Sequence, residues 1–125
     1  MEMTTFLEKA KMTREVRVVV QGSEDEVRTP IWIVTVGPSV FIRSYRASDG
    51  NWYQHVLAER TFPLEIEGQD VSVRAEPVTT ATTQNDVSAA YEAKYPGEPE
   101  TAEMISPPVV ATTLQLVPAE GDPHQ

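Results

Sequence analysis

The stretch from Val27 to Val56, VRTPIWIVTVGPSVFIRSYRASDGNWYQHV, decides the fold of this chain. Its first part, Thr29 to Val36, is rich in β-branched and aromatic residues, which favours a strand. Gly37-Pro38-Ser39 interrupts the pattern as a tight turn, and Val40 to Tyr45 resumes it. The stretch therefore predicts two paired strands, followed by a loop and a short helix.

The second of these strands carries two different faces. Because side chains alternate along a strand, Val40, Ile42 and Ser44 are expected on one face, and Phe41, Arg43 and Tyr45 on the other. The whole stretch concentrates three arginines and three large aromatic residues: Arg28, Arg43, Arg46, Trp32, Trp52 and Tyr53. If the protein has a ligand, we expect it here.

The length and composition indicate one ordinary globular domain. The 125 residues are 40% hydrophobic, which is enough to bury a core. We expect the domain to span residues 1–118 and the tail, residues 119–125, to be disordered. There are no cysteines, which excludes disulfides, thiolate catalysis and zinc-thiolate sites.

The charge balance argues against a nucleic-acid partner. The net charge of -9 comes from 19 acidic and 10 basic residues, whereas binding to a phosphate backbone needs a basic face. Between Arg28 and Arg60, however, four arginines face only Asp49 and Glu59, which suits a small anionic ligand. The N-terminus does not resemble a secretory signal, and no apolar run reaches the ~20 residues that span a bilayer. We therefore expect a cytoplasmic protein without a membrane partner.

The rest of the chain alternates strand patterns with short helix patterns. Strands are predicted at 14–21, 62–67, 71–78 and 109–117, and helices at 5–12, 52–60 and 86–95. The segment 98–108, with three prolines and three glutamates, is predicted to be an irregular loop. Six strands joined mostly by tight turns predict a mainly β protein, an antiparallel sheet curled into a small barrel with two or three short helices.

No familiar catalytic motif appears, so the arginines and aromatic residues carry the functional interpretation. Guanidinium groups match phosphate or carboxylate geometry, and Thr29 and Ser44 could add hydroxyl donors. An arginine such as Arg43 reaches an anion, pairs with a buried acid, or lies in solvent. Trp32 suits core or dimer packing, and Trp52 with Tyr53 suits either a flat ligand or helix packing. These alternatives stay open on the residues alone.

Three segments resemble the core of the split β-barrel flavin-binding superfamily: Arg28 to Trp32, Val40 to Arg46, and Asn51-Trp52-Tyr53. That superfamily includes pyridoxamine-phosphate-oxidase-like proteins and deazaflavin-dependent nitroreductases. The pattern is most similar to a small branch of unknown function. Its members share these segments, a later A-Y-x-A-K-Y (Ala90 to Tyr95 here) and a final T-T-L-x-L-x-P (Thr112 to Pro118). The resemblance covers roughly residues 14–118.

The resemblance implies a six-stranded split barrel that forms a homodimer, with the cofactor at the subunit interface. It places Arg28 and Thr29 on the strand that faces a flavin. It assigns the flavin phosphate to three residues of the R-S-Y-R segment, Arg43, Ser44 and Arg46. Trp32 and Tyr45 belong to the same candidate site, and Trp52 or Tyr53 would lie near the ring or the partner chain.

One departure from the superfamily bears on the choice of cofactor. The nitroreductases carry G-R-K-S-G just before this hairpin, whereas this chain has the acidic Gly22-Ser23-Glu24-Asp25-Glu26. Because that segment would repel an anionic deazaflavin tail, the resemblance favours FMN over deazaflavin. A member of the fold without any cofactor is a further alternative.

Two functional hypotheses follow from the sequence. The first is a flavin-dependent oxidoreductase that acts on a small organic substrate, in which the cofactor performs the chemistry and the protein binds and orients. The second is a non-catalytic ligand-binding or structural protein on the same barrel, because a fold does not fix a function. If an anion is bound, replacing Arg43 with alanine is expected to weaken binding by roughly 1.5–3 kcal/mol.

Overall fold

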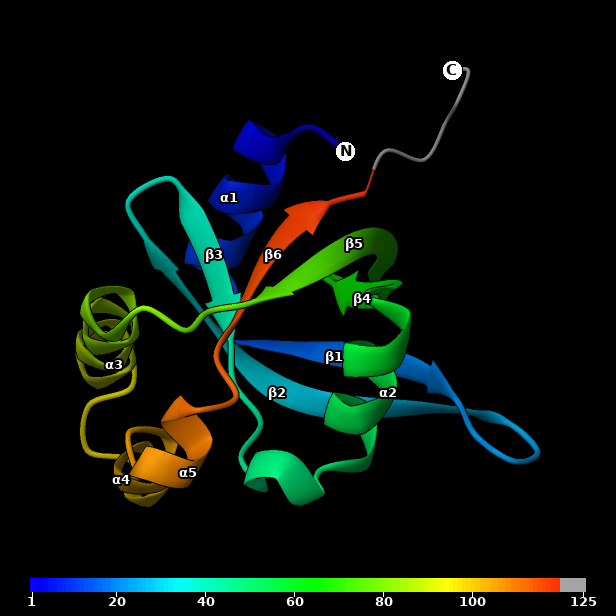
Figure 1. Ribbon diagram of the computed structural model, residues 1–125. Helices are drawn as coiled ribbons and strands as arrows, with labels where there is room; N and C mark the ends of the chain where they lie inside the picture. Colours follow the sequence, from blue (N-terminus) through cyan, green and yellow to red (C-terminus); the bar gives the residue numbers. More distant parts are fainter. Residues whose placement is uncertain (120–125) are drawn as a thin grey trace.

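The computed structural model describes residues 1–119 and contains a closed barrel of six antiparallel strands (Figure 1). The strands follow the order β1-β2-β3-β6-β5-β4 around the barrel. Their bounds are Glu15–Gln21 (β1), Glu26–Val36 (β2), Ser39–Ile42 (β3), Thr61–Ile66 (β4), Gln69–Pro77 (β5) and Leu114–Pro118 (β6). The mainly β, six-stranded antiparallel barrel predicted from the sequence is confirmed.

Short helices connect the strands and cover two sides of the barrel. Figure 1 shows α3, α4 and α5 gathered on one side of it, α1 near one end and α2 near β4. Their bounds are Met3–Met12 (α1), Asn51–Glu59 (α2), Ala81–Lys94 (α3), Pro99–Met104 (α4) and Pro107–Val110 (α5), with a 3-10 turn η1 at Ala47–Asp49.

The helices differ from the sequence prediction in number and in their first residues. The first helix begins at Met3 rather than residue 5, without a side-chain cap, and α3 begins at Ala81 rather than residue 86. The expected loop at 98–108 contains α4 and α5 instead. Each of these helices begins with proline, which suits the first turn because its missing N–H has no helical partner there. The prolines thus start helices here rather than prevent them.

β3 and β6 are shorter than predicted. Beyond their ends, threonine hydroxyl groups form hydrogen bonds with the backbone in place of a neighbouring strand. β3 ends at Ile42, and the next free amide, that of Ser44, donates to the hydroxyl of Thr112 at 2.9 Å. The final strand begins only at Leu114, because Thr112 and Thr113 turn back to donate to the carbonyls of the helix before them. The predicted extensions to Tyr45 and back to residue 109 are therefore wrong.

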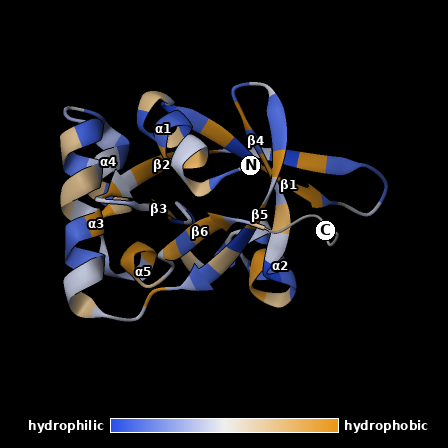
Figure 2. Ribbon diagram, turned by 90° about the horizontal axis from the view of Figure 1, so that it is seen from above, coloured by the Kyte–Doolittle hydropathy of each residue, from blue (hydrophilic) through white to orange (hydrophobic). Residues whose placement is uncertain are grey.

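The interior of the barrel is filled by alternate residues of every strand. Hydrophobic and hydrophilic residues alternate along β1 and β2 in Figure 2. The predicted inward residues of β4 and β5 are all buried: Phe62, Leu64, Ile66, Val71, Val73 and Ala75. Pairing of Val18 with Leu64 closes the sheet between β1 and β4. Phe6 from α1 and Val56 from α2 complete this core.

A second core lies outside the barrel, between the sheet and the helices. Val34 and Phe41 point away from the interior and pack against Val87 and Tyr91 of α3 and Val109 of α5. β3 and the second half of β2, from Ile31 to Val36, are therefore covered on both faces. This explains why their sequence is apolar almost without interruption.

The C-terminal residues of α3 fasten that helix to β2 and to α1. The Lys94 ammonium donates to three backbone carbonyls, those of Ala10 (2.9 Å), Thr13 (2.7 Å) and Ile33 (2.7 Å). The Tyr95 hydroxyl lies 3.0 Å from the Ile33 carbonyl and 3.2 Å from its amide. The A-Y-x-A-K-Y segment thus has a structural explanation. Lys94 and Tyr95 satisfy the backbone groups of Ile33, which lies on β2 just beyond the residue that pairs with the start of β1.

Candidate functional site

One cavity brings together most of the residues that the sequence singled out. It has a volume of about 740 Å³, within the range of small-molecule sites. Its walls are the start of β1, the middle of β2, the segment from β3 to the start of α2, and α4. The lining residues are Arg14, Glu15, Thr29 to Trp32, Arg43 to Arg46, Asp49 to Trp52, Glu98, Glu100 and Met104.

Trp32 forms a flat aromatic wall of this cavity. Its indole lies parallel to the buried Tyr95 ring, with centroids 3.9 Å apart and an interplanar angle of 1°. The Arg14 guanidinium lies 5.8 Å from the indole centroid and forms a 2.6 Å ion pair with Glu98. One face of the indole is therefore covered by Tyr95, and the partly exposed side chain borders the cavity.

Arg43 is fully buried at the back of the cavity, and its hydrogen-bond partners are all neutral. Its guanidinium donates to the hydroxyls of Thr113 (2.8 Å) and Ser88 (2.9 Å) and to two backbone carbonyls, those of Met104 (2.9 Å) and Gln84 (2.8 Å). It also lies 5.5 Å from the Tyr91 ring centroid. Within residues 1–119 no carboxylate pairs with it. Burial lowers the pKa of Arg43, as expected for a cation without a counter-charge.

The segment after Arg43 forms a tight turn that presents Tyr45 and Arg46 to the cavity. The Ser44 hydroxyl donates to the Ala47 carbonyl at 2.7 Å, and Ala47 has a left-handed φ of 56°. Gly50 closes the turn, because a Cβ there would lie 2.6 Å from the Ser44 hydroxyl oxygen. Tyr45 is 50% exposed and Arg46 is also exposed.

Arg46 differs from Arg14, the other exposed arginine of this site, in its partners. Among the described residues it takes part in no ion pair, whereas Arg14 is neutralised by Glu98. The remaining carboxylates of the cavity, Glu15, Asp49 and Glu100, are exposed to solvent, as Arg46 is, so screening weakens charges of both signs there. The chemistry available is therefore a flat apolar surface at Trp32 and positive charge along the segment from Arg43 to Arg46.

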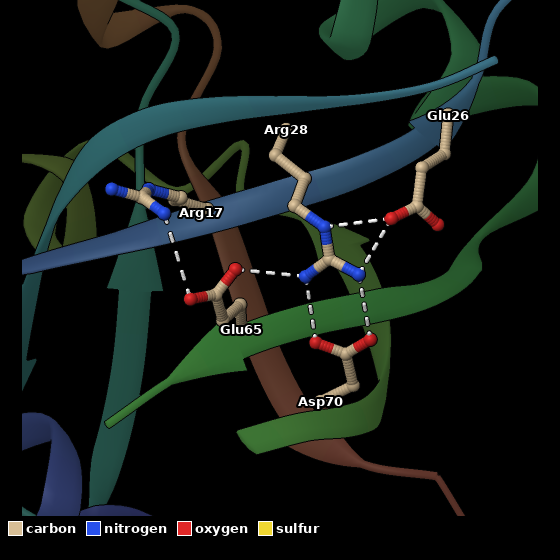
Figure 3. Close-up of polar contacts among 5 residues, drawn as sticks. All are labelled: Arg17, Glu26, Arg28, Glu65 and Asp70. Carbon is tan, nitrogen blue, oxygen red and sulfur yellow. Dashed lines mark hydrogen bonds and ion pairs between the residues drawn. The ribbon is translucent and has the colours of Figure 1, made fainter. Parts of the chain in front are cut away.

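Arg28 lies outside this cavity and is bound by three carboxylates (Figure 3). Its guanidinium contacts Glu26 at 2.7 Å, Glu65 at 2.8 Å and Asp70 at 2.9 Å. Asp70 first, and then the other two carboxylates, raises the pKa of Arg28, and Arg28 in turn lowers the pKa of Asp70. This network ties β2 to the hairpin of β4 and β5.

The cavity therefore includes seven of the nine predicted site residues: Thr29, Trp32, Arg43, Ser44, Tyr45, Arg46 and Trp52. Arg28 lies in the ion-pair network. Tyr53 is only 7% exposed and packs in the barrel core, where burial raises the pKa of its hydroxyl. The expected common face of Arg43 and Tyr45 is not formed, because β3 ends at Ile42 and the two side chains differ completely in exposure.

Sequence reasoning missed the opposite wall of the cavity. Arg14 and Glu15 precede the buried part of β1, and Glu98, Glu100 and Met104 lie in the segment that was expected to be an irregular loop. The pairing of Glu15 with Trp32 was the one available signal, because it follows from aligning the two valine-rich strands. No group of three or more His, Asp or Glu within residues 1–119 is arranged to hold a metal ion.

The chain belongs to a bacterial family described as uncharacterized protein conserved in bacteria, DUF2255, whose model matches residues 6–116. No curated protein matches it. Among residues 1–119 there is no helix long and apolar enough to cross a membrane.

Solved structures show the fold. A candidate pyridoxamine 5'-phosphate oxidase from Listeria innocua has a TM-score of 0.64 at 9% identity, covering 94% of both chains. A conserved hypothetical protein from Mycobacterium tuberculosis scores 0.60 at 11% identity, covering 93% of this chain and 78% of that one. An FAD and heme binding protein from Mycobacterium smegmatis scores 0.52 at 20% identity, covering 95% and 66%. The resemblance to the split β-barrel superfamily is thus confirmed at the level of the fold.

Proposed function

We propose that the cavity binds a flat anionic cofactor of the flavin type, FMN, and that the protein is an oxidoreductase of a small organic substrate. One observation carries this proposal: a partly exposed indole and two arginines without carboxylate partners among residues 1–119 line a single cavity of about 740 Å³. A ring system needs a flat apolar surface, and a phosphate needs positive charge. The fold is shared with a candidate pyridoxamine 5'-phosphate oxidase and with an FAD and heme binding protein, which also supports a flavin-type cofactor.

In this proposal Arg46 holds the phosphate directly and Arg43 acts at longer range. Four of the five N–H groups of Arg43 are already bonded to protein atoms, so it contributes mainly its charge. Trp32 orients the ring, and the walls of the cavity exclude water. When bound, the flavin supplies the electron or hydride chemistry itself. FMN is preferred to deazaflavin because the segment from Gly22 to Glu26 is acidic.

A non-catalytic or purely structural role is the second candidate, and the geometry of Arg43 favours it. Its hydrogen bonds join α3, α4 and Thr113, the residue before β6, which is what a structural arginine does. Turnover of a reduced nicotinamide with an electron acceptor by the flavin-loaded protein would distinguish an enzyme from a binding module.

Replacing Arg46 with alanine is expected to weaken FMN binding by about 10- to 150-fold, the loss of one charge-assisted hydrogen bond of roughly 1.5–3 kcal/mol. Binding of riboflavin, which lacks the phosphate, should stay unchanged. The measurement is a titration of ligand-stripped protein followed by flavin fluorescence.

Arg28→Ala is the matched control, because it removes an arginine of the same stretch whose charge three carboxylates already neutralise. It should leave the affinity for FMN unchanged. Equal FMN affinity in wild type and Arg46→Ala would remove Arg46 from the site, and the absence of FMN binding to wild type would refute the proposed cofactor.

We also propose that the protein is a homodimer whose interface includes Tyr45. This aromatic side chain is 50% exposed at the edge of the cavity, where a second copy would cover it. Sedimentation at micromolar concentration should give twice the chain mass of 13.9 kDa, and Tyr45→Glu should shift it toward one chain. A monomer for the wild type would contradict this assembly.

A further inference from the structure

The strongest feature that the proposed function leaves unexplained is the support behind Trp32. The two rings of Trp32 and Tyr95 are parallel within 1° and 3.9 Å apart, although they come from residues 63 positions apart, from 32 to 95. Tyr95 is fully buried, so its ring is held between the indole and the second core. Such a stack fixes the plane of the indole at the cavity wall.

The Tyr95 hydroxyl is held as firmly as its ring. It donates to the Arg14 carbonyl at 2.6 Å and contacts both backbone groups of Ile33, the amide at 3.2 Å and the carbonyl at 3.0 Å. The pairing of β1 with β2 stops at Glu15 opposite Trp32, so Ile33 is the first residue of β2 beyond it. Tyr95 therefore anchors the strand directly next to the indole that its ring supports.

Trp52, the other tryptophan of the cavity, is placed differently. It is only 5% exposed and meets Tyr53 edge-on, with centroids 6.0 Å apart and an angle of 89°. Its ring belongs to the barrel core. Of the two indoles, Trp32 has the more accessible face, and it is the one backed by a parallel ring.

We infer that Trp32 is the platform on which the flat ring system of the ligand stacks, and that Tyr95 is the positioning residue that holds this platform. The inference rests on the proposed binding of a flavin-type ligand and deepens it. Stacking on an aromatic side chain tolerates changes in the ring's substituents, because it depends on the π face rather than on hydrogen bonds. The indole therefore recognises the ring, and Arg46 recognises the phosphate.

The test uses riboflavin and FMN as two probes of the purified full chain. Trp32→Leu should weaken both ligands by the same factor, about 5- to 150-fold, which is the range for loss of an aromatic stack. Trp32→Phe should restore most of the affinity. Phe62→Leu, the matched control, removes a buried aromatic ring of the barrel core that does not line the cavity and should leave the affinity unchanged. A shift of the visible flavin absorption band on binding should be lost in Trp32→Leu and kept in Phe62→Leu.

The positioning role of Tyr95 is tested by a double-mutant cycle. Tyr95→Leu should weaken riboflavin in the wild-type background and have no further effect in the Trp32→Leu background, because it acts through the indole. Equal losses in both backgrounds would overturn this role. If Tyr95→Leu does not fold, Tyr95→Phe replaces it: the ring remains, so the riboflavin affinity and absorption band should be preserved while thermal stability falls. A loss of affinity as large as that of Trp32→Leu would refute the role of the ring.

The outcomes separate this inference from the proposed function. Flavin binding that is indifferent to Trp32→Leu overturns the stacking platform and leaves the cofactor proposal intact. Failure of wild type to bind either flavin overturns the cofactor proposal and the platform together.

Discussion

Replacing Arg43 with methionine is expected to lower the free energy of unfolding by about 3–5 kcal/mol. Methionine leaves the buried Thr113 hydroxyl, the partly buried Ser88 hydroxyl and two backbone carbonyls without this donor, and each unsatisfied buried group costs about 1–3 kcal/mol with incomplete additivity. The hydroxyl and carbonyl partners come from α3, α4 and Thr113 before β6, so the loss should loosen the helices that cover the outer core. Chemical denaturation followed by circular dichroism measures it.

Two variants make this prediction specific. Arg28→Met removes an arginine from the same stretch, but its network is on the surface, so stability should change far less. Arg43→Lys keeps the charge and loses the planar fork, so it should be intermediate. If Arg43→Met were as stable as Arg28→Met, the buried network would not stabilise the fold, and an external anion would be the better explanation for the arginine.

Replacing Lys94 with methionine should lower the free energy of unfolding by about 1–3 kcal/mol at neutral pH, because three carbonyls lose one ammonium donor. The pH dependence should change as well. Burial, and after it the nearby Arg14, lowers the pKa of Lys94 from 10.5 to about 8. Between about pH 8 and 10.5 the unfolded chain therefore binds more protons than the folded one, so the stability contributed by Lys94 rises with pH across that window and falls as pH drops through 8.

The difference in stability between wild type and Lys94→Met should accordingly widen from pH 8 to pH 10. Urea denaturation at several pH values provides the measurement. Lys11→Met, which removes an exposed lysine of α1, should run parallel to wild type over the same range. Parallel curves for wild type and Lys94→Met would show that Lys94 keeps the same protonation in both states.

The strands could be predicted because their signal is local. In β4 and β5 the apolar residues recur at every second position, and Phe62, Leu64 and Val73 are all buried as that period requires. The turn at Gly37 likewise follows from two adjacent residues. The closure of the barrel could not be predicted from local patterns, because the pairing of β3 with β6 joins Ile42 to Leu114, which are far apart in the sequence.

The candidate site could be predicted only in part, because the role of each arginine depends on its hydrogen-bond and ion-pair partners. The sequence showed Arg28, Arg43 and Arg46 as equivalent cations. Their different surroundings depend on residues 37 to 70 positions away, such as Glu65 for Arg28 and Thr113 for Arg43. Within the hairpin, Glu26, two residues before Arg28, was the local sign that this arginine forms an ion pair. The helices at 98–110 were missed for a related reason, because a proline that starts a helix looks the same in sequence as one that prevents it.

The position of β6 has a consequence for how this chain reaches its fold. β6 is the last described strand in sequence, yet it lies between β3 and β5 and pairs with both. During synthesis, everything from β1 to α5 is made before the barrel can close, so the edges of β3 and β5 that pair with β6 stay unpaired until β6 has been synthesised. Exposed edges of that kind invite pairing with other chains. Closure of the barrel therefore has to wait for β6, the last of its six strands in the sequence.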